Sequence, residues 1–559
     1  MFYRKRMDDL EQWRDSVGRK PLIVRGARQV GKTTLVATFG KTFKQYLSLN
    51  LEKTKDAAFF HSYQDAQELT QQLFLEHGLD YRLRAETLLF IDEIQQVPSA
   101  VNMLRYFYEE IPELPVIAAG SMLESLLGKS VTFPVGRVSY LMLRPFSFEE
   151  YLIATSTPQQ IAAFQTVPVP KIAENLLFEK FTFYAFLGGM PAVIQRYIET
   201  KDITQLKPIF EELIESYQDD AEKYAQNFEQ LQQLRFVIRQ LGKEAGSRIT
   251  FSGFGGMTYQ SKTVAELFRM LEKTHLCKLI YPTVGQQYPI ETDFAKAPRL
   301  HFLDTGLMNF VANIQVEVLR STDLCTIYTG KMIEHLVGQE MLASMRYPSE
   351  TPHFWVRQKR GSQAEIDYLV QHEGKLYPVE VKSGKTGKLK SLFVYMETAP
   401  VDIAIRLYAG EFSTDELQTT TGKAFTLINV PYFHAEKVGS YITWCLSNSR
   451  KAFSTVMNEP IEIYNQTIKK KAVFQKQKPV LLADLKVLQA CSKQAQSARY
   501  LLEEILMKTF QTTNKRSYIQ PLIEKGYLEL TDKENIKSRY QKYRITATGL
   551  VYLASIKKE

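Results

Sequence analysis

The 559-residue sequence predicts a multidomain α/β protein that begins with a parallel β-sheet. Three observations support this prediction. A glycine-containing loop at residues 26–34 fits the phosphate-binding consensus, and an apolar run at residues 88–93 ends in two acids. Strand-like and helix-like patterns also alternate across residues 1–150. Such alternation is typical of a parallel sheet with helices on both faces.

Composition favours several folded units in one globular chain. A chain of this length exceeds one hydrophobic core, so roughly three to five units are expected. The hydrophobic content is 45%, with no apolar run long enough for a membrane span, which predicts a cytoplasmic protein that does not enter a membrane. The 4 cysteines lie far apart, which argues against a zinc site or disulfide framework. The net charge of +9 favours a polyanionic partner such as DNA, or only a basic surface.

The loop Gly-Ala-Arg-Gln-Val-Gly-Lys-Thr-Thr follows the apolar run Leu22–Val24 and precedes a helical pattern. Its glycines allow backbone N–H groups to point at a polyphosphate, and the next helix adds positive potential. Lys32 is predicted to neutralise phosphate and the Thr33 hydroxyl to bind Mg²⁺, which makes ATP and Mg²⁺ the expected cofactors. The candidate nucleotide-binding residues are Gly26, Ala27, Arg28, Gln29, Val30, Gly31, Lys32, Thr33 and Thr34. The alternative is a turn that matches by chance.

The run Leu-Leu-Phe-Ile-Asp-Glu at residues 88–93 has the pattern of a buried strand that ends in two acids. Asp92, at the strand tip, is predicted to hold the Mg²⁺ directly or through water. Glu93 is predicted to polarise the attacking water, which hydrolysis requires and binding alone does not. The two motifs together predict an ATPase.

The other elements of this first unit follow the same alternation. We predict helices at 7–17, 66–77 and 100–110 and strands at 45–50, 87–92, 115–119 and 131–143. Ser121, after the strand at 115–119, is a candidate to orient water beside the γ-phosphate, or else a helix cap. Arg137 is a candidate to reach a nucleotide on a neighbouring subunit of a homo-oligomer, or else a surface ion-pair partner.

Further motifs give the sequence a family resemblance. After the phosphate-binding loop come Phe-Ile-Asp-Glu-Ile-Gln, Ala-Gly-Ser, Gly-Arg and Leu-x-Pro-Phe-Ser-Phe-x-Glu-Tyr-Leu, and later Leu187–Pro191 and Leu303–Leu307. Over residues 10–440 the sequence resembles prokaryotic AAA-type P-loop ATPases fused to a C-terminal domain of unknown function with a nuclease-like core. The resemblance implies the AAA fold and ATP as ligand, and it leaves the biological role open.

We predict six segments along the chain. They are an AAA-type P-loop core (1–155), a helical lid (156–225), a winged helix (226–292), a PD-(D/E)XK restriction-endonuclease-like α/β domain (293–448), a linker (449–480) and a C-terminal winged helix (481–559). In the first winged helix, a strand at 277–281 is expected to pair with residues 287–289. This domain either contacts DNA or serves as a protein–protein spacer.

A second constellation lies between residues 329 and 410. Glu334 falls on a predicted helix, Asp367 on one strand, and Glu380 and Lys382 on the next. Because residues two apart share a strand face, pairing of the two strands would bring Asp367 and Glu380 together. The order helix-Glu, Asp, Glu-x-Lys resembles the PD-(D/E)XK nucleases, whose carboxylates hold Mg²⁺. The alternatives are a fold kept only for binding and mere surface pairing.

In residues 481–559, the sequence pattern predicts helices near 483–492, 498–507 and 514–525, followed by two strands around a lysine-rich turn. Three helices and a wing indicate a second winged helix. Its basic residues at the helix start and wing are the candidate DNA contacts. They are Lys515, Arg516, Lys537, Arg539 and Lys542. A basic dimerisation or docking module is the alternative.

The sequence thus predicts an ATP-hydrolysing AAA-type protein whose C-terminal half engages DNA under nucleotide control. One alternative is an ATP-regulated, Mg²⁺-dependent nuclease. Another is an ATP-dependent switch that binds a protein partner and keeps an inactive nuclease fold. The pathway, the preferred DNA and the oligomeric state are not predicted.

Overall fold

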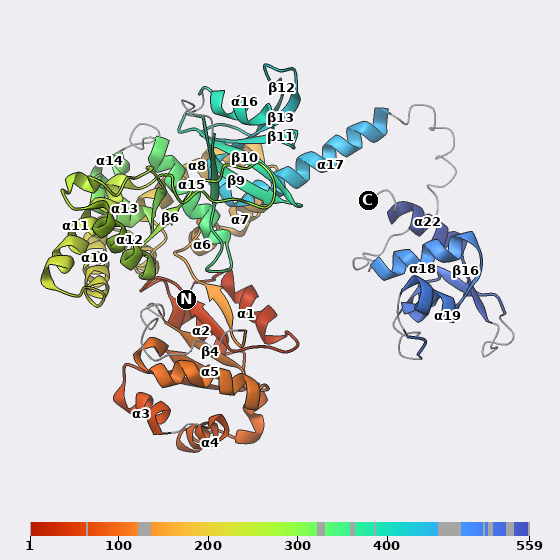
Figure 1. The fold of residues 1–559 in the computed structure, drawn as a ribbon, viewed down its shortest axis with the longest axis horizontal. Coiled ribbons are helices and arrows are strands. Elements are labelled where there is room, and N and C mark those ends of the chain that lie inside the picture. Colours follow the sequence, from red (N-terminus) through yellow and green to blue (C-terminus); the bar gives the residue numbers. More distant parts are fainter. Residues whose placement is uncertain are drawn as a thin grey trace. The chain divides into compact units, whose positions relative to one another are not determined.

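The computed structural model describes residues 2–62, 65–120, 136–320, 330–357, 364–384, 387–456, 482–506, 509–511, 518–532 and 541–556. The chain forms two compact units, Met1–Thr455 and Val456–Glu559 (Figure 1). Among the helices of these residues, none is both long enough and apolar enough to cross a membrane.

The first unit begins with a five-stranded parallel sheet. Its order is β2 (Gln45–Asn50), β3 (Thr87–Asp92), β4 (Val116–Ala119), β1 (Leu22–Arg25) and β5 (Ser139–Met142). Strand β4 therefore lies between β1 and β3, the two strands that end in the motifs. Every residue of β3 and β4 is buried, as expected of central strands with helices on both faces.

Helices cover this sheet on both sides. They are α1 (Arg6–Arg14), α2 (Lys32–Gly40), α3 (Thr54–Ser62), α4 (Ala66–Glu76) and α5 (Pro98–Glu110). On one face Leu69, Leu73 and Leu104 of α4 and α5 are buried in a cluster with Leu89 and Ile91 of β3. Helices α3, α4 and α5 lie beside one another at this end of the first unit (Figure 1). Burying each such side chain contributes roughly 1.5–3 kcal/mol.

A run of helices follows the sheet, as predicted for residues 156–225. These are α6 (Phe148–Thr155), α7 (Pro158–Gln165), α8 (Lys171–Leu187), α9 (Pro191–Thr200) and α10 (Lys207–Glu222). Helix α6 begins with a capping box, because the Ser147 hydroxyl accepts from the Glu150 N–H while the Glu150 carboxylate accepts from the Ser147 N–H.

The next segment contains α11 (Phe228–Glu244), α12 (Ser261–Lys273), β6 (Cys277–Ile280) and β7 (Arg299–Phe302). Strand β6 pairs antiparallel with β7, with Cys277 opposite Phe302. Our prediction that residues 287–289 form the second strand was wrong. Those residues are exposed, whereas Leu300 and Phe302 of β7 are fully buried, so β7 supplies the apolar side chains that the core requires.

A six-stranded mixed sheet completes the first unit. Its order is β12 (Ser413–Gln418), β13 (Ala424–Pro431), β11 (Ile403–Tyr408), β10 (Lys375–Val381), β9 (Glu365–His372) and β8 (His353–Val356). The accompanying helices are α13 (Thr305–Ala312), α14 (Gln315–Arg320), α15 (Gly330–Ser344), α16 (Lys390–Met396), the 3₁₀ helix η7 (Tyr432–Lys437) and α17 (Val438–Val456). Helix α17 continues through residues 449–456, where we expected a polar connector.

The second unit has a small core of its own. Its elements are α18 (Leu482–Lys493), β14 (Gln496–Ser497), α19 (Ala498–Tyr500), the π-helical turn η8 (Leu501–Ile505), α21 (Gln520–Glu524), β15 (Leu528–Leu530), β16 (Lys542–Ile545) and α22 (Ala547–Ile556). The antiparallel sheet order is β14, β16, β15. Leu488, Leu502, Leu522 and Tyr543 are buried together in this core.

Candidate functional site

The phosphate-binding loop connects β1 to α2 and has a backbone that only glycine fits at two positions. Gly26 has φ +150°, and an added Cβ would lie 2.1 Å from the carbonyl oxygen of Leu143. Gly31 has φ 94°, in the left-handed region, and caps the N-terminus of α2. The loop therefore curls tightly at the positive end of a helix, which is the arrangement that binds phosphate.

The Lys32 side chain is buried inside this loop. Its Nζ donates to the carbonyl oxygens of Gly26, at 3.0 Å, and Ala27, at 2.9 Å. Burial lowers the pKa of Lys32 to about 8, although the carboxylates of Glu93 and Asp92 oppose this shift. Two neutral carbonyls are weaker partners than an anion, so a phosphate oxygen would be the better acceptor for this ammonium.

In the structure, Thr33 at the start of α2 lies beside Asp92 and Glu93 at the end of β3. The Thr33 hydroxyl donates to Asp92 Oδ2 at 2.7 Å, and the backbone N–H of Glu93 donates to Asp92 Oδ1 at 3.0 Å. Glu93 has φ 51°, and its carboxylate accepts from the amide of Gln95 at 2.5 Å. Burial raises the pKa of Glu93, while the Gln95 hydrogen bond lowers it less. A half-buried carboxyl of raised pKa beside the Thr33 hydroxyl and the Asp92 carboxylate has the chemistry of a general base.

Helix α10 contacts the outer side of the loop. The Arg28 guanidinium forms an ion pair with Asp220 at 2.8 Å, and the Tyr217 hydroxyl donates to the carbonyl of Arg28 at 2.7 Å. The Gln29 amide also lies 3.3 Å from the hydroxyl of Ser216. The middle of the loop is thus held by protein groups, while Lys32, Thr33 and Thr34 belong to the helix start.

Arg4 is a loop contact that sequence reasoning missed. Its Nη1 donates to the carbonyl of Val30 at 2.8 Å, its Nη2 to the carbonyl of Arg144 at 2.6 Å, and its Nε to Glu150 at 3.1 Å. No motif marks an arginine near the start of a chain, so no sequence signal could have identified it. A cavity of about 70 Å³ lies beside this arginine. It is lined by Phe2, Arg4, Met7, Gly31, Thr34, Leu35, Thr38, Phe146 and Pro191.

Of the two secondary candidates, Ser121 and Arg137, the structure describes only Arg137. Ser121 lies outside the described residues. Arg137 is described, is partly exposed, and forms an ion pair with Glu109 on α5. That contact matches the surface-pair alternative, and its reach toward another subunit stays a prediction.

The second constellation also comes together, on β9, β10 and α15. Val379 lies opposite Tyr368 in the antiparallel pair, which places Glu380 beside Asp367. The backbone N–H of Val381 donates to Asp367 Oδ2 at 2.8 Å, and Lys382 Nζ donates to Glu380 Oε1 at 2.6 Å. The strand pattern therefore predicted the convergence of these side chains.

Arg299 lies among these acids, and it was not identified from the sequence. This buried side chain comes from β7, and its Nη2 lies 3.4 Å from Glu334, 2.5 Å from Glu365 and 3.6 Å from Asp367. A guanidinium therefore neutralises the carboxylates that we predicted would hold Mg²⁺. Within the part of the chain that the structure describes, no group of three or more His, Cys, Asp or Glu residues is arranged to hold a metal ion.

The acids around Arg299 outnumber the positive charges that they contact. Burial, and then the Asp367 carboxylate, raise the pKa of Glu334 to about 8 and that of Glu380 to about 7. Glu365 also pairs with Arg248, at 3.2 Å. Four carboxyls therefore share three cations, so this acidic cluster of Glu334, Glu365, Asp367 and Glu380 retains protons near neutral pH.

In the second unit, Lys542 is the predicted DNA contact that the structure describes. It lies on β16, where exposed Lys542 and Arg544 alternate with buried Tyr543 and Ile545. The strand therefore presents its basic residues on one face. The other four candidates, Lys515, Arg516, Lys537 and Arg539, fall outside the described residues.

Comparison with protein families agrees with this architecture. Residues 18–152 match a family described as an AAA domain. Residues 178–317 match a domain of unknown function (DUF8612), and residues 329–432 match another (DUF4143). The N-terminal part of the chain is therefore a parallel-sheet P-loop domain of the AAA type. The DUF8612 match crosses the boundaries that we predicted at 225/226 and 292/293.

Similar solved structures are distant. A Walker-type ATPase of Pyrococcus abyssi is 12% identical, with a TM-score of 0.36, over 56% of this chain and 96% of that one. A signal transduction ATPase (STAND) protein with a tetratricopeptide repeat sensor from Pyrococcus horikoshii is 16% identical, with a TM-score of 0.22, over 62% and 48% of the two chains. The Aeropyrum pernix ORC1 protein, solved in complex with DNA, is 10% identical, with a TM-score of 0.21, over 56% and 90%. No functionally curated protein matches the chain.

Proposed function

We propose that this protein binds and hydrolyses ATP in its N-terminal domain and that its C-terminal half engages DNA under nucleotide control. The observation that supports the ATPase most directly is the contact of Thr33 with Asp92 at 2.7 Å, beside Lys32 and Glu93. A hydroxyl and a carboxylate at the end of a phosphate-binding loop suit Mg²⁺, which supplies charge neutralisation on the phosphates.

Each residue of the site has a proposed role that follows from its position. The N–H groups at the start of α2 and the Lys32 ammonium hold phosphate, and Thr33 and Asp92 hold the metal. The Glu93 carboxylate accepts a proton from water, which its raised pKa favours. The cavity of about 70 Å³ beside Gly31 has apolar walls that suit the adenine ring, including Phe2 and Phe146. Ser121 and a partner subunit's arginine at position 137 remain secondary proposals.

Two variants test the ATPase. Lys32→Ala is expected to lose ATP binding and turnover, because the loop loses its only buried cation among the described residues. Glu93→Gln is expected to bind ATP normally while kcat falls by about 10²–10⁴-fold, since the amide cannot accept the proton. Lys41→Ala, an exposed lysine after the same helix, is the matched control. Normal turnover in Glu93→Gln would remove its role as base.

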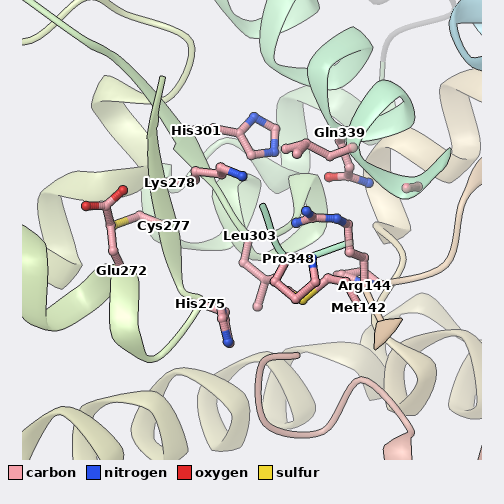
Figure 2. Close-up of a pocket in the computed structure, with 13 residues that line it drawn as sticks. Met142, Arg144, Glu272, His275, Cys277, Lys278, His301, Leu303, Gln339 and Pro348 are labelled. Carbon is pink, nitrogen blue, oxygen red and sulfur yellow. The ribbon is translucent and has the colours of Figure 1, made fainter. Parts of the chain in front are cut away.

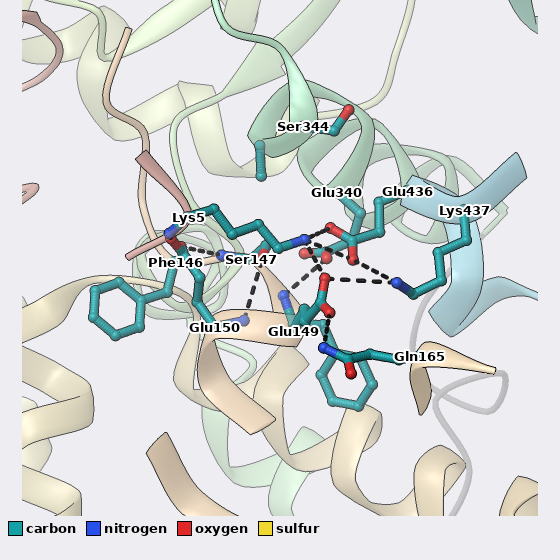
Figure 3. A network of polar contacts seen from close by, with 12 residues as sticks. Lys5, Phe146, Ser147, Glu149, Glu150, Gln165, Glu340, Ser344, Glu436 and Lys437 are labelled. Carbon is teal, nitrogen blue, oxygen red and sulfur yellow. Dashed lines mark hydrogen bonds and ion pairs between the residues drawn. The ribbon is translucent and has the colours of Figure 1, made fainter. Parts of the chain in front are cut away.

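Nucleotide control is supported by a polar network that joins the N-terminal segment to the α/β half. Arg4 contacts the phosphate-binding loop, and the next residue, Lys5, donates to Glu436 on η7 at 2.8 Å and pairs with Glu149 (Figure 3). A conformational change in the phosphate-binding loop can therefore be transmitted to η7, beside the mixed sheet, through Arg4 and Lys5. We propose this segment as the coupling element.

DNA engagement is proposed for the second unit. The three helical segments α18, α19 with η8, and α21, together with the sheet ordered β14, β16, β15, are the expected parts of a winged helix, to which α22 is added at the end. The exposed Lys542 and Arg544 suit phosphate contacts. The double variant Lys542→Gln/Arg544→Gln should weaken duplex binding and lower its salt dependence. Lys525→Gln, an exposed lysine on the neighbouring α21 end, should leave both unchanged. Equal binding by the two variants would count against this surface.

For the acidic cluster, the position of Arg299 favours the second candidate, a nuclease-like fold used for binding without cleavage. The guanidinium takes the place where a metal cation would balance Glu334 and Asp367. The test incubates the protein and its Asp367→Ala variant with DNA, Mg²⁺ and ATP. We expect intact DNA in both, with ATP consumed. Metal-dependent cleavage that disappears in the variant would instead establish the nuclease alternative.

A further inference from the structure

A cavity of about 290 Å³ lies in the first unit, and none of the residues that line it belongs to the phosphate-binding loop or to the acidic cluster. Its walls come from three parts of the chain, namely the segment after β5, the α12–β6 corner with β7, and helix α15 (Figure 2). A volume near the lower end of small-molecule sites suits a compact metabolite and excludes a polymer.

Two cations face each other across this cavity. The Lys278 ammonium and the Arg144 guanidinium point toward one another, with the His301 ring beside them (Figure 2). Lys278 Nζ donates to the carbonyl oxygen of Glu350 at 2.7 Å, and Arg144 Nε is buried without a hydrogen-bond partner. Within the described residues, neither side chain forms an ion pair.

The acids near the cavity compensate these charges only in part, because Glu272 and Glu350 raise the pKa of Lys278, and Glu350 that of Arg144, by less than burial lowers them. The carboxyl group of Glu272 points away from the cavity (Figure 2) and accepts the backbone N–H of Leu279 at 2.8 Å. Burial lowers the pKa of His275 to about 3, and it lowers the pKa of His301 well below its ordinary value. Both imidazoles are therefore neutral at physiological pH and can donate or accept hydrogen bonds without adding charge.

The electrostatic consequence is a cavity with excess positive charge. Burial lowers the pKa of Lys278 to about 8 and that of Arg144 to about 10. The Arg144 charge lowers the pKa of Lys278 further, and the Arg6 charge lowers that of Arg144, while the carboxylates of Glu272 and Glu350 oppose these shifts without cancelling them. Desolvated like charges destabilise the empty protein, whereas a bound anion would relieve both effects. The site is thus suited to an anion that enters with two negative charges.

We propose that this cavity binds a small phosphorylated metabolite, whose phosphate is held between Arg144 and Lys278. A phosphate monoester carries nearly two negative charges at neutral pH, which matches the two cations. The planar guanidinium can bind two phosphate oxygens side by side, and the ammonium binds as a point charge. The neutral histidines and the amide of Gln339 then border the uncharged part of the ligand.

This proposal does not depend on ATP hydrolysis. No residue of the phosphate-binding loop lines the cavity, and the connection between them is indirect. Arg4 donates to the backbone carbonyl of Arg144 and to that of Val30 in the loop. Because that loop is itself proposed to bind phosphate, the test must remove its contribution.

The experiment uses the full chain with Lys32→Ala as the parent and titrates inorganic phosphate, glucose 6-phosphate and glucose by calorimetry. We expect saturable 1:1 binding of at least one phosphate probe and none of glucose. Adding Lys278→Met should raise Kd at least tenfold, while Lys278→Arg should retain binding. Lys262→Met, an exposed lysine on α12, should leave Kd unchanged. Failure of both phosphate probes to bind, or equal Kd in the Lys278→Met variant, would overturn the proposal.

Thermal unfolding without ligand separates this role from a structural one. Because Lys278→Met removes one of two facing charges, its Tm should equal or exceed that of the parent. A phosphate probe that binds should raise the Tm of the parent and not that of the variant. A variant that melts well below the parent would identify Lys278 as a structural cation and overturn the proposed binding role.

Discussion

Glu340, on α15, is a carboxyl group buried between the helical segment and the mixed sheet. Its Oε2 accepts the backbone N–H of Phe148 at 2.9 Å, and its Oε1 lies 2.7 Å from the Tyr184 hydroxyl. That hydroxyl also donates to the carbonyl of Phe146, so a protonated Glu340 can in turn donate to Tyr184. Burial, reinforced by Glu436, raises the pKa of Glu340 to about 8.

The Glu340 carboxyl is expected to make stability fall as pH rises. Its folded-state pKa lies above its ordinary value, so the folded protein binds the proton more tightly between about pH 4.5 and 8, and this stabilisation is lost through that window. Glu340→Gln mimics the protonated acid and should be more stable than the natural protein at pH 8.5, by roughly 2–4 kcal/mol. Denaturant unfolding at pH 5.5 and 8.5 measures this difference. An equal pH dependence in both proteins would contradict it.

Arg299 is the residue on which the acidic cluster depends. Besides its ion pairs, its Nη1 donates to the carbonyl of Asp367 at 2.9 Å, and its guanidinium lies 4.7 Å from the ring centre of Phe354. Removing one partner of a buried ion pair destabilises a protein by more than the intact pair stabilises it, because the remaining charge is left buried without an opposite charge.

Arg299→Ala is therefore expected to destabilise the protein by about 3–5 kcal/mol at pH 8. The loss should be smaller at pH 5.5, where more of the carboxyls are protonated. Arg248→Ala removes another partner of Glu365, at 3.2 Å and partly exposed, and should cost less than about 1 kcal/mol. Chemical denaturation of the two variants compares them directly. Equal losses would show that Arg299 does not neutralise the cluster.

At the scale of elements, two motifs of the family resemblance meet in space. The Asp304 carboxylate, which caps α13, accepts the backbone N–H of Gly189 at 2.5 Å. A Cβ on Gly188 would lie 2.1 Å from Asp304 Oδ1, so only glycine allows this approach. The motifs at 187–191 and 303–307 therefore form one junction, between the end of α8 and the start of α13.

A second junction is the network around Lys5 (Figure 3). Although burial alone would lower the pKa of Lys5, Glu436 and Glu149 hold it above its ordinary value. Lys437 is farther from the same acids, 3.6 Å from Glu149 and 3.9 Å from Glu436. Lys5 therefore joins the N-terminal segment to α6 and η7 more directly than Lys437 does.

Lys5→Met should destabilise the first unit by about 3 kcal/mol, because two buried carboxylates lose their closest cation. Lys437→Met, the matched control from the same network, should have a smaller effect. Adding Glu436→Gln to Lys5→Met should recover part of the loss, since one of the repelling charges is removed. Denaturant unfolding of these three variants measures the effects. If the free-energy changes of Lys5→Met and Glu436→Gln simply add in the double variant, Lys5 and Glu436 are not coupled.

At the scale of the whole molecule, the first unit has a continuous core. One buried cluster extends from Leu10 through Leu177 and Phe302 to Cys445, so it includes the P-loop sheet, the helical segment and the mixed sheet. The core of the second unit is a separate cluster, from Val487 to Leu553. A shared core unfolds cooperatively, and separate cores need not unfold together.

Calorimetry of the full chain is therefore expected to show two unfolding transitions. Mg²⁺-ATP, added to the Glu93→Gln variant to prevent turnover, should raise the free energy of unfolding of the first unit by about 2.7 kcal/mol at a hundredfold excess over Kd. The transition of the second unit should shift by less, since nucleotide control of DNA engagement requires only a modest coupling free energy between the units. A single transition, or equal shifts of both, would show that the two units unfold as one.

Much of the N-terminal fold could be predicted from the sequence. Strands β2 and β3 lie at the predicted residues, and the parallel arrangement is confirmed. The convergence of Asp367 and Glu380 also followed from strand alternation. The strand partner of β6 could not be predicted, because burial and not turn chemistry selected residues 299–302 over 287–289.

The sequence by itself determined the phosphate-binding loop, the acids that end β3 and the alternation that defines the sheet. These depend on glycine conformations and on spacing along a few neighbouring residues, which the order of the chain specifies directly. Only the tertiary structure decided that Arg4 contacts the loop, that Arg299 neutralises the acidic cluster, and that Arg144 and Lys278 share a cavity. The physical reason is that a charged side chain acquires its role from the partners that folding brings to it, and those partners lie far away in the chain.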